Sequence, residues 1–122
     1  MSQFMTLLVE DDPLQREVMA DLLRDEGFDV IECSTGEAAE LIVATSGTEL
    51  QALIADNSLA GNMTGVELAE YARGRHPKMN IILMSGRQVT PLPPRATFLH
   101  KPFPPVRLLE AVRGNGRATP VS

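Results

Sequence analysis

The sequence contains a single cysteine, Cys33, among 122 residues, so no disulfide can form within the chain. A lone thiol is typical of a small core side chain in a protein from a reducing compartment. No run approaches the roughly 20 consecutive apolar residues that a membrane span requires. The start, MSQFMTLLVEDD, lacks the charged segment, long apolar core and cleavage site of a secretion signal. We therefore expect a cytoplasmic protein that does not associate with a membrane.

Positive charge is also scarce. The chain has 11 basic and 16 acidic residues, a net charge of -5 and a pI near 4.9. Non-specific nucleic-acid binding requires a broad basic surface, so direct binding of nucleic acid is not expected. Apolar residues, in contrast, make up 43% of the chain, and 122 residues is the size of one domain with one buried core.

Short apolar runs alternate with segments of helical periodicity along most of the chain. Buried parallel strands are predicted at 4–9, 50–55, 81–84 and 98–99, and an alternating edge strand at 28–33. Helices are predicted from Pro13 to a stop at Gly27, from a cap at Ser34 or Thr35 to near Gly47, from 66 to the breakers Gly74 and Pro77, and at 106–112. Strands that alternate with helices imply a parallel sheet with helices on both faces.

The connection between Ser85 and Ala96 departs from this alternation. Its sequence, GRQVTPLPPR, places three prolines within four positions and shows no apolar period. Such a segment cannot form a regular helix. We predict an irregular or extended crossover where a fourth helix would be expected.

Polar residues follow four of the predicted strands at their carboxyl ends: Glu10 with Asp11, then Asp56, Ser85 and Lys101. The carboxyl ends of parallel strands share one edge of the sheet, where ligands bind in crevices, so four segments converge on one small site. Three carboxylates a few ångströms apart repel one another unless a cation neutralises them. Hard oxygen ligands with room for water suit Mg²⁺. We therefore predict a Mg²⁺ site at this edge.

The same residues supply what phosphoryl transfer requires: a carboxylate nucleophile, a metal, an ammonium group that holds a phosphate oxygen and a hydroxyl beside it. Asp56, Mg²⁺, Lys101 and Ser85 fill these roles in turn. Each feature alone has a simpler explanation, since aspartate is common in turns and acids favour helix starts. The functional interpretation is favoured because a turn aspartate does not explain a lysine and a serine at two other strand ends.

Four segments, taken in order, resemble the receiver domains of two-component response regulators, the CheY-like superfamily. They are VEDDP at 9–13, LIADNSLAGNMTG at 53–65, ILMSGR at 82–87 and FLHKPF at 98–103. The resemblance implies a flavodoxin-like, doubly wound α/β fold with a five-stranded parallel sheet in the order 2-1-3-4-5 and, here, a fourth helix that is shortened or absent. The receiver domain would span 1–113, and a disordered tail is predicted at 114–122.

The resemblance also implies how the acidic residues act. Asp56 is the phosphorylated aspartate. Asp11 ligates Mg²⁺ directly, and Glu10 acts largely through water. The backbone carbonyl of Ser58 is a further metal ligand, and the side chain of Ser58 tunes loss of the phosphoryl group.

Further residues belong to the switch that the family uses. Ser85 matches the switch hydroxyl and Lys101 the lysine that pairs with the phosphoryl group. Phe98 matches an aromatic residue that changes rotamer, although a fixed core aromatic explains it equally well. The resemblance implies a cis Lys101–Pro102 bond, which a tertiary amide permits at low cost.

The loop after Asp56 departs from the family pattern. Leu59 and Ala60 stand where Met-Pro is usual, and Gly65 comes nine residues after Asp56 where eight is commoner. We expect a slightly longer loop of different shape, with an effect on the lifetime of the phosphoryl group.

The implied partner is a histidine kinase or a histidine phosphotransfer protein, and the family also allows a homodimer. No enzyme activity is expected beyond the domain's own phosphotransfer and autodephosphorylation. One alternative is an interaction module that keeps the fold and needs no phosphorylation. Another is a Mg²⁺-dependent phosphatase of the aspartyl-phosphate type, but Ser58 stands where such an enzyme needs a second aspartate as its acid-base group.

Overall fold

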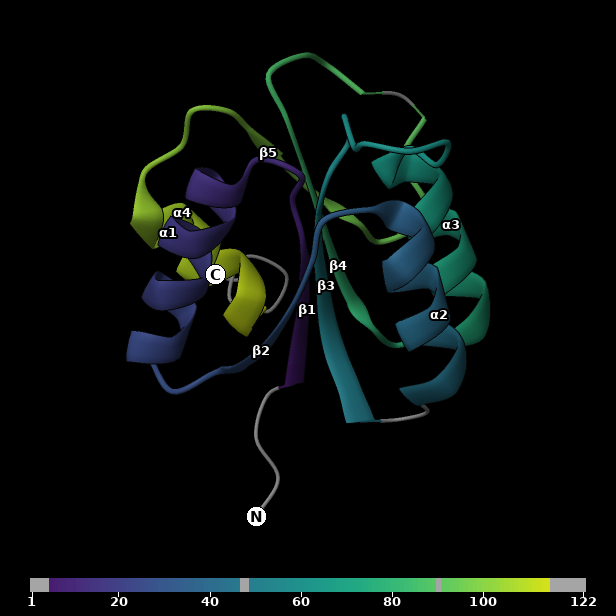
Figure 1. Cartoon of the computed structure of the whole chain (residues 1–122), viewed down its shortest axis with the longest axis horizontal. Coiled ribbons are helices and arrows are strands. Elements are labelled where there is room, and N and C mark those ends of the chain that lie inside the picture. Colours follow the sequence, from purple (N-terminus) through teal and green to yellow (C-terminus); the bar gives the residue numbers. More distant parts are fainter. Residues whose placement is uncertain (1–4, 47–48, 90, 115–122) are drawn as a thin grey trace.

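The structure, a computed structural model, describes residues 5–46, 49–89 and 91–114, and it contains a parallel sheet in the order β2-β1-β3-β4-β5 (Figure 1). The strands are β1 (Met5–Val9), β2 (Asp29–Cys33), β3 (Leu50–Asp56), β4 (Asn80–Ser85) and β5 (Thr97–His100). The predicted strands and their order are confirmed. Side chains of the central strands are almost all buried, as expected for runs that are apolar at successive positions.

Helices cover both faces of this sheet (Figure 1). Within the described residues they are α1 (Pro13–Asp25), α2 (Gly36–Ser46), α3 (Gly65–Arg75) and α4 (Pro105–Arg113). Alternate side chains of a strand enter opposite cores. Leu7 and Val9 pack in the cluster beneath α2 and α3, whereas Leu8 packs in the cluster beneath α1 and α4. The flavodoxin-like, doubly wound arrangement is therefore confirmed.

Side-chain caps determine where α1 and α3 begin. Asp12 precedes α1, and its carboxylate accepts hydrogen bonds from the amides of Leu14 at 2.9 Å and Gln15 at 3.2 Å. Thr64 precedes α3 and forms a capping box with Glu67, in which each side chain accepts from the other's amide. These bonds satisfy amide groups that have no partner within the helix.

The structure decides the start of α2 and corrects the predicted end of α3. Of the two candidate caps of α2, Thr35 accepts a hydrogen bond from the Ala38 amide at 3.1 Å. The predicted break at Gly74 is wrong, because α3 continues through it to Arg75. A glycine inside a helix costs about 0.5–1 kcal/mol, which is too little to end α3 at Gly74. The chain leaves the helix just before Pro77, which cannot continue it.

The crossover from β4 to β5 contains no helix among its described residues, as predicted. Arg73 of α3 holds it in place: its guanidinium group donates to the carbonyls of Pro94, Pro77 and Met79 at 3.0, 2.9 and 2.7 Å. Arg95, with a φ of 61°, donates to the same carbonyl of Pro77 at 2.9 Å. Hydrogen bonds from two arginines therefore hold the irregular crossover against the end of α3.

Several sequence predictions are not tested by this fold. Residues 115–122 lie outside the described part of the chain, so the disordered tail stays a prediction. The cytoplasmic location stays one too. No helix in the described ranges is long and apolar enough to cross a bilayer. Cys33 is buried at the end of β2, in agreement with a core role.

Candidate functional site

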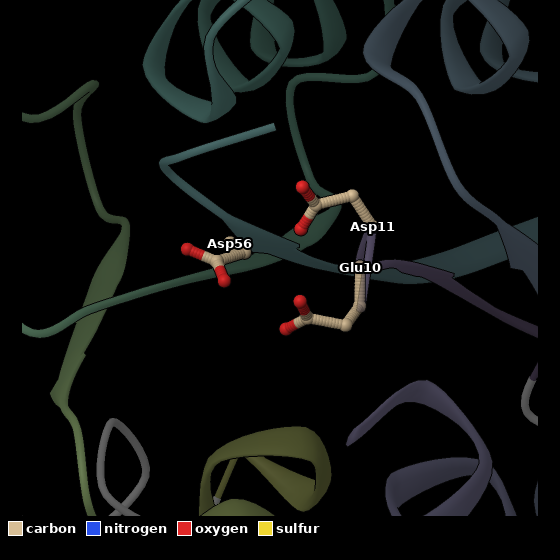
Figure 2. Close-up of side chains that lie close together, drawn as sticks. All are labelled: Glu10, Asp11 and Asp56. Carbon is tan, nitrogen blue, oxygen red and sulfur yellow. The ribbon is translucent and has the colours of Figure 1, made fainter. Parts of the chain in front are cut away.

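Three carboxylates meet at the carboxyl edge of the central strands (Figure 2). Glu10 and Asp11 come directly after β1, and Asp56 ends the neighbouring strand β3. An oxygen of each carboxylate lies within 4.8 Å of the others. Glu10 and Asp56 are buried, with 1% and 8% of their surface exposed, whereas Asp11 is exposed. The structure therefore brings the three predicted acids, the acidic cluster, together.

Lys101 follows β5 and reaches across the sheet edge to these acids. Its ammonium group donates to Asp56 Oδ2 at 2.7 Å and to Glu10 Oε1 at 3.2 Å. A third acceptor, Gln15 Oε1 on α1, lies at 2.9 Å. The sequence predicted the lysine at this edge but not the glutamine, because an exposed polar residue in a helix carries no distinguishing pattern.

The electrostatics of the cluster depend on burial. Burial is the main reason why the pKa of the Glu10 carboxyl is raised to about 7. A hydrogen bond from the Asp12 amide lowers this pKa, the charge of Asp56 raises it, and Lys101 lowers it. Burial lowers the pKa of Lys101, but its hydrogen bonds to Asp56 and Glu10 outweigh this and raise it above its ordinary value. The ionised form of Glu10 is therefore disfavoured near neutral pH, and the charge of a nearby divalent cation would favour it.

Glu10 should make stability fall with rising pH when no divalent cation is present. Its carboxyl has a pKa of about 7 in the folded chain and an ordinary value of 4.5 when unfolded, so the folded state binds the proton more tightly. Its contribution to the unfolding free energy is full below pH 4.5 and is lost as the pH rises through about 7. In urea unfolding with EDTA, the wild type should lose about 1–3 kcal/mol more than Glu10→Gln between about pH 5 and about pH 8. Equal pH dependence of the two proteins would contradict this.

Both predicted serines lie at the edge that holds Asp56. Ser85 ends β4 and is 5% exposed; its Oγ accepts from the Arg87 amide at 3.0 Å, and its carbonyl accepts from the Lys101 amide at 2.8 Å. Ser58 is exposed, and its amide donates to Asp56 Oδ1 at 3.1 Å. Their functional roles stay predictions.

Phe98 lies within β5, opposite Leu83 of β4, and Pro102 follows Lys101. Phe98 is half-buried and packs against the core beneath α2 and α3, with its ring edge-on to His100 at a centroid distance of 6.3 Å. Its role as a switch stays a prediction. The Lys101–Pro102 peptide bond is cis, as the resemblance implied.

Comparison with known proteins decides the family. The family described as "Response regulator receiver domain" matches residues 6–113 of this sequence. The chain belongs to the response regulator receiver domains.

This receiver domain is similar to proteins from several bacteria. It is 33% identical over 112 residues to the response regulator protein FleR of Pseudomonas aeruginosa. The aligned region covers 87% of this chain and 23% of FleR. A response regulator receiver protein from Sinorhizobium medicae superposes with a TM-score of 0.87 at 27% identity, over 95% of this chain and 96% of that one. The receiver domain of sensor histidine kinase PA1611 from Pseudomonas aeruginosa, which has a magnesium ion coordinated in its active site cleft, shares the fold at 21% identity. Its TM-score is 0.77, over 93% of this chain and 96% of that one.

The loop at 57–64 of this receiver domain is held by the β2–α2 region. The Glu37 carboxylate accepts a hydrogen bond from the Asn62 amide at 2.9 Å. Thr35 and Ala60 form an isolated parallel bridge. The loop thus folds back onto the start of α2. This contact of Glu37 was not predicted, because the residue looks like any acid in a first helical turn.

Gly65 brings the start of α3 against the backbone of Asp56. Its amide donates to the Asn57 carbonyl at 3.0 Å, and the Val66 amide donates to Asn57 Oδ1 at 3.1 Å. A Cβ atom added to Gly65 would lie 2.5 Å from the Asp56 carbonyl oxygen and 2.7 Å from Asn57 Cα. A side chain at position 65 is therefore incompatible with this packing. The sequence placed Gly65 nine residues after Asp56, but this close approach of two backbones was not predicted.

Proposed function

We propose that this receiver domain takes a phosphoryl group from a phosphohistidine onto Asp56 in a Mg²⁺-dependent reaction. The donor is a histidine kinase or a histidine phosphotransfer protein. The observation that carries the proposal is the position of the Asp56 carboxylate. It shares the acidic cluster with Glu10 and Asp11, and its Oδ2 lies 2.7 Å from the Lys101 ammonium group. Nucleophile, metal ligands and a cation for the phosphoryl oxygens thus lie within one site.

The acidic cluster is a donor set suited to Mg²⁺. Its ligands are hard carboxylate oxygens, and the exposure of Asp11 leaves room for the water molecules that Mg²⁺ retains. Asp11, Asp56 and the carbonyl of Ser58 would hold the ion. The magnesium ion coordinated in the active site cleft of the PA1611 receiver domain supports a magnesium ion here. When bound, Mg²⁺ neutralises charge that develops on the transferring phosphoryl group.

Glu10 would act on the ion through water. Both of its carboxylate oxygens already have partners: Oε1 accepts from Lys101 at 3.2 Å and Oε2 accepts from the Asp12 amide at 3.1 Å. These bonds keep the side chain pointed along the sheet edge. Its charge therefore contributes to cation affinity without direct ligation.

Asp56 acts as the nucleophile. As one carboxylate oxygen bonds to phosphorus, the bond between phosphorus and the donor imidazole nitrogen breaks, and the imidazole takes a proton from solvent. Lys101, already 2.7 Å from Asp56, pairs with an oxygen of the acquired group. The Ser85 hydroxyl, which accepts from the Arg87 amide, turns to donate a hydrogen bond to another oxygen of the phosphoryl group. The Phe98 side chain changes rotamer in response. The acyl phosphate thereby shifts an equilibrium between two loop arrangements towards the one in which Ser85 and Lys101 contact the phosphoryl group.

The chemistry ends with loss of the phosphoryl group from Asp56. Ser58, two residues further on, supplies no acid-base group for turnover of other substrates. The chain spans 23% of the length of FleR, so nothing about the output of that longer protein transfers to it. We propose that phosphorylation is read as a conformational signal or passed on in a phosphorelay.

Phosphorylation should require the divalent cation. With acetyl phosphate and Mg²⁺, the wild type is expected to gain one phosphoryl group, about 80 Da in the intact mass spectrum. With EDTA the extent should fall at least about tenfold, because the uncompensated carboxylates repel the anionic donor. Restoring excess Mg²⁺ to the same sample is the control. An equal extent of phosphorylation with EDTA and with Mg²⁺ would contradict the proposed requirement for Mg²⁺.

A second candidate function is an interaction module that needs no phosphorylation. The crossover between β4 and β5 favours it, because arginine hydrogen bonds hold an irregular segment where a helix would present a binding face. Partner binding that is equal for the wild type and Asp56→Ala would support this module. Binding that changes with acetyl phosphate would support the switch.

A further inference from the structure

Gln15 belongs to the surroundings of Lys101, although it lies on α1 and not at a strand end. The ammonium group has three N–H donors. They point at Asp56 Oδ2 at 2.7 Å, Gln15 Oε1 at 2.9 Å and Glu10 Oε1 at 3.2 Å. Two of these acceptors are carboxylates of the acidic cluster. The amide of Gln15 is the neutral one.

Asp12 orients the Gln15 side chain. The Asp12 carboxylate accepts from the Gln15 backbone amide at 3.2 Å and from Gln15 Nε2 at 3.3 Å. Since the NH₂ group of the amide faces Asp12, its carbonyl oxygen faces Lys101. The exposed side chain is thus held at both ends, with its acceptor towards the ammonium group.

The remaining side chains on this side of Lys101 are apolar. A groove of about 570 Å³ adjoins the lysine, and apart from Gln15 and Lys101 its lining consists of Leu14, Val18, Met19, Pro102 and Phe103. Leu14, Val18, Pro102 and Phe103 have no side-chain acceptor, and the thioether sulfur of Met19 is only a weak one. Gln15 is therefore the side-chain acceptor that the groove offers.

We propose that Gln15 is a positioning residue that keeps the Lys101 ammonium group directed at Asp56 when a divalent cation occupies the acidic cluster. Carboxylates that share their charge with a cation hold an ammonium group less strongly, and the cation repels it. The Gln15 carbonyl is not among the oxygens of the cluster and keeps its bond. The inference rests on the proposed function, in which Lys101 pairs with the phosphoryl group on Asp56.

Beryllofluoride, which imitates a phosphoryl group on a carboxylate, tests this role by binding alone. Gln15→Leu removes the acceptor at similar size. At saturating Mg²⁺ its affinity for beryllofluoride is expected to be about five- to tenfold lower than that of the wild type. Its affinity for Mg²⁺ alone should stay within about twofold, with an unchanged Tm, because an exposed side chain that is not a ligand is removed. The matched control is Gln51→Leu, the same substitution at the start of β3, at the opposite end of the strand from Asp56. It should change none of these values.

Three other outcomes would contradict the role of Gln15. Equal or tighter beryllofluoride binding by Gln15→Leu would overturn the role of Gln15 and leave the proposed function standing. Parallel losses of Mg²⁺ and beryllofluoride affinity would also overturn it, because they indicate general damage to the acidic cluster. If the wild type itself fails to bind beryllofluoride with Mg²⁺, the proposed function and the role of Gln15 both fall.

Discussion

Asp56→Asn is expected to gain no phosphoryl group from acetyl phosphate and Mg²⁺ under conditions in which the wild type gains one. The asparagine side chain has nearly the same shape, and its carbonyl oxygen still accepts a hydrogen bond from Lys101. It lacks the negative charge that makes the carboxylate a nucleophile and a metal ligand. The chemistry is therefore lost while the packing of the buried site is kept. Intact mass spectrometry and phosphate-affinity electrophoresis measure the difference.

The control for this experiment is a second aspartate of the same chain. Asp21 is exposed on α1 and lies outside the acidic cluster, so Asp21→Asn should be phosphorylated like the wild type. This variant makes the same change of charge without touching the site. Equal phosphorylation of the wild type and Asp56→Asn would place the acceptor elsewhere and refute the assignment.

Gly65→Ala is expected to lower the unfolding free energy by about 1–3 kcal/mol, the usual cost of forcing extra atoms into a packed site. The added Cβ would lie 2.5 Å from the Asp56 carbonyl oxygen, a backbone atom that no rotamer change can move away. Relief requires a shift of α3 or of the end of β3. We therefore also expect slower phosphorylation, because Asp56 moves relative to Lys101. Urea unfolding at equilibrium measures the first effect.

Gly74→Ala is the matched control, because it makes the same substitution in the same helix. A Cβ at Gly74 meets no atom within 4 Å, so this variant should gain about 0.5–1 kcal/mol from the higher helix propensity of alanine. The two substitutions are thus expected to have opposite signs. A Gly65→Ala variant as stable as Gly74→Ala would show that the close approach of α3 to Asp56 is not needed.

Much of the site could be predicted because buried parallel strands are apolar along their whole length. A polar residue directly after such a run marks the strand's carboxyl end, and these ends meet at one edge of the sheet. Glu10, Asp56 and Lys101 follow this rule, and their side chains do meet. The prolines between β4 and β5 were equally informative, because proline excludes a helix by its covalent structure.

Other predictions failed or were never made because local sequence did not contain the deciding contact. Gly74 is a poor helix former, yet α3 passes through it. Propensity is a weak preference that the surrounding helix outweighs. Glu37 looks like an ordinary residue of a first helical turn, but it binds the Asn62 amide, 25 positions away.

The sequence by itself determined the order of strands and helices, the irregular crossover and the set of polar residues at the sheet edge. Apolar periodicity and the chemistry of proline act within a few residues, and the carboxyl ends of parallel strands always share one edge of the sheet. Only the tertiary structure decided that Gln15 meets Lys101, 86 positions away, and that position 65 has no room for a side chain. Such contacts depend on how separate elements are placed in space, and the spacing of residues along the chain does not record that placement.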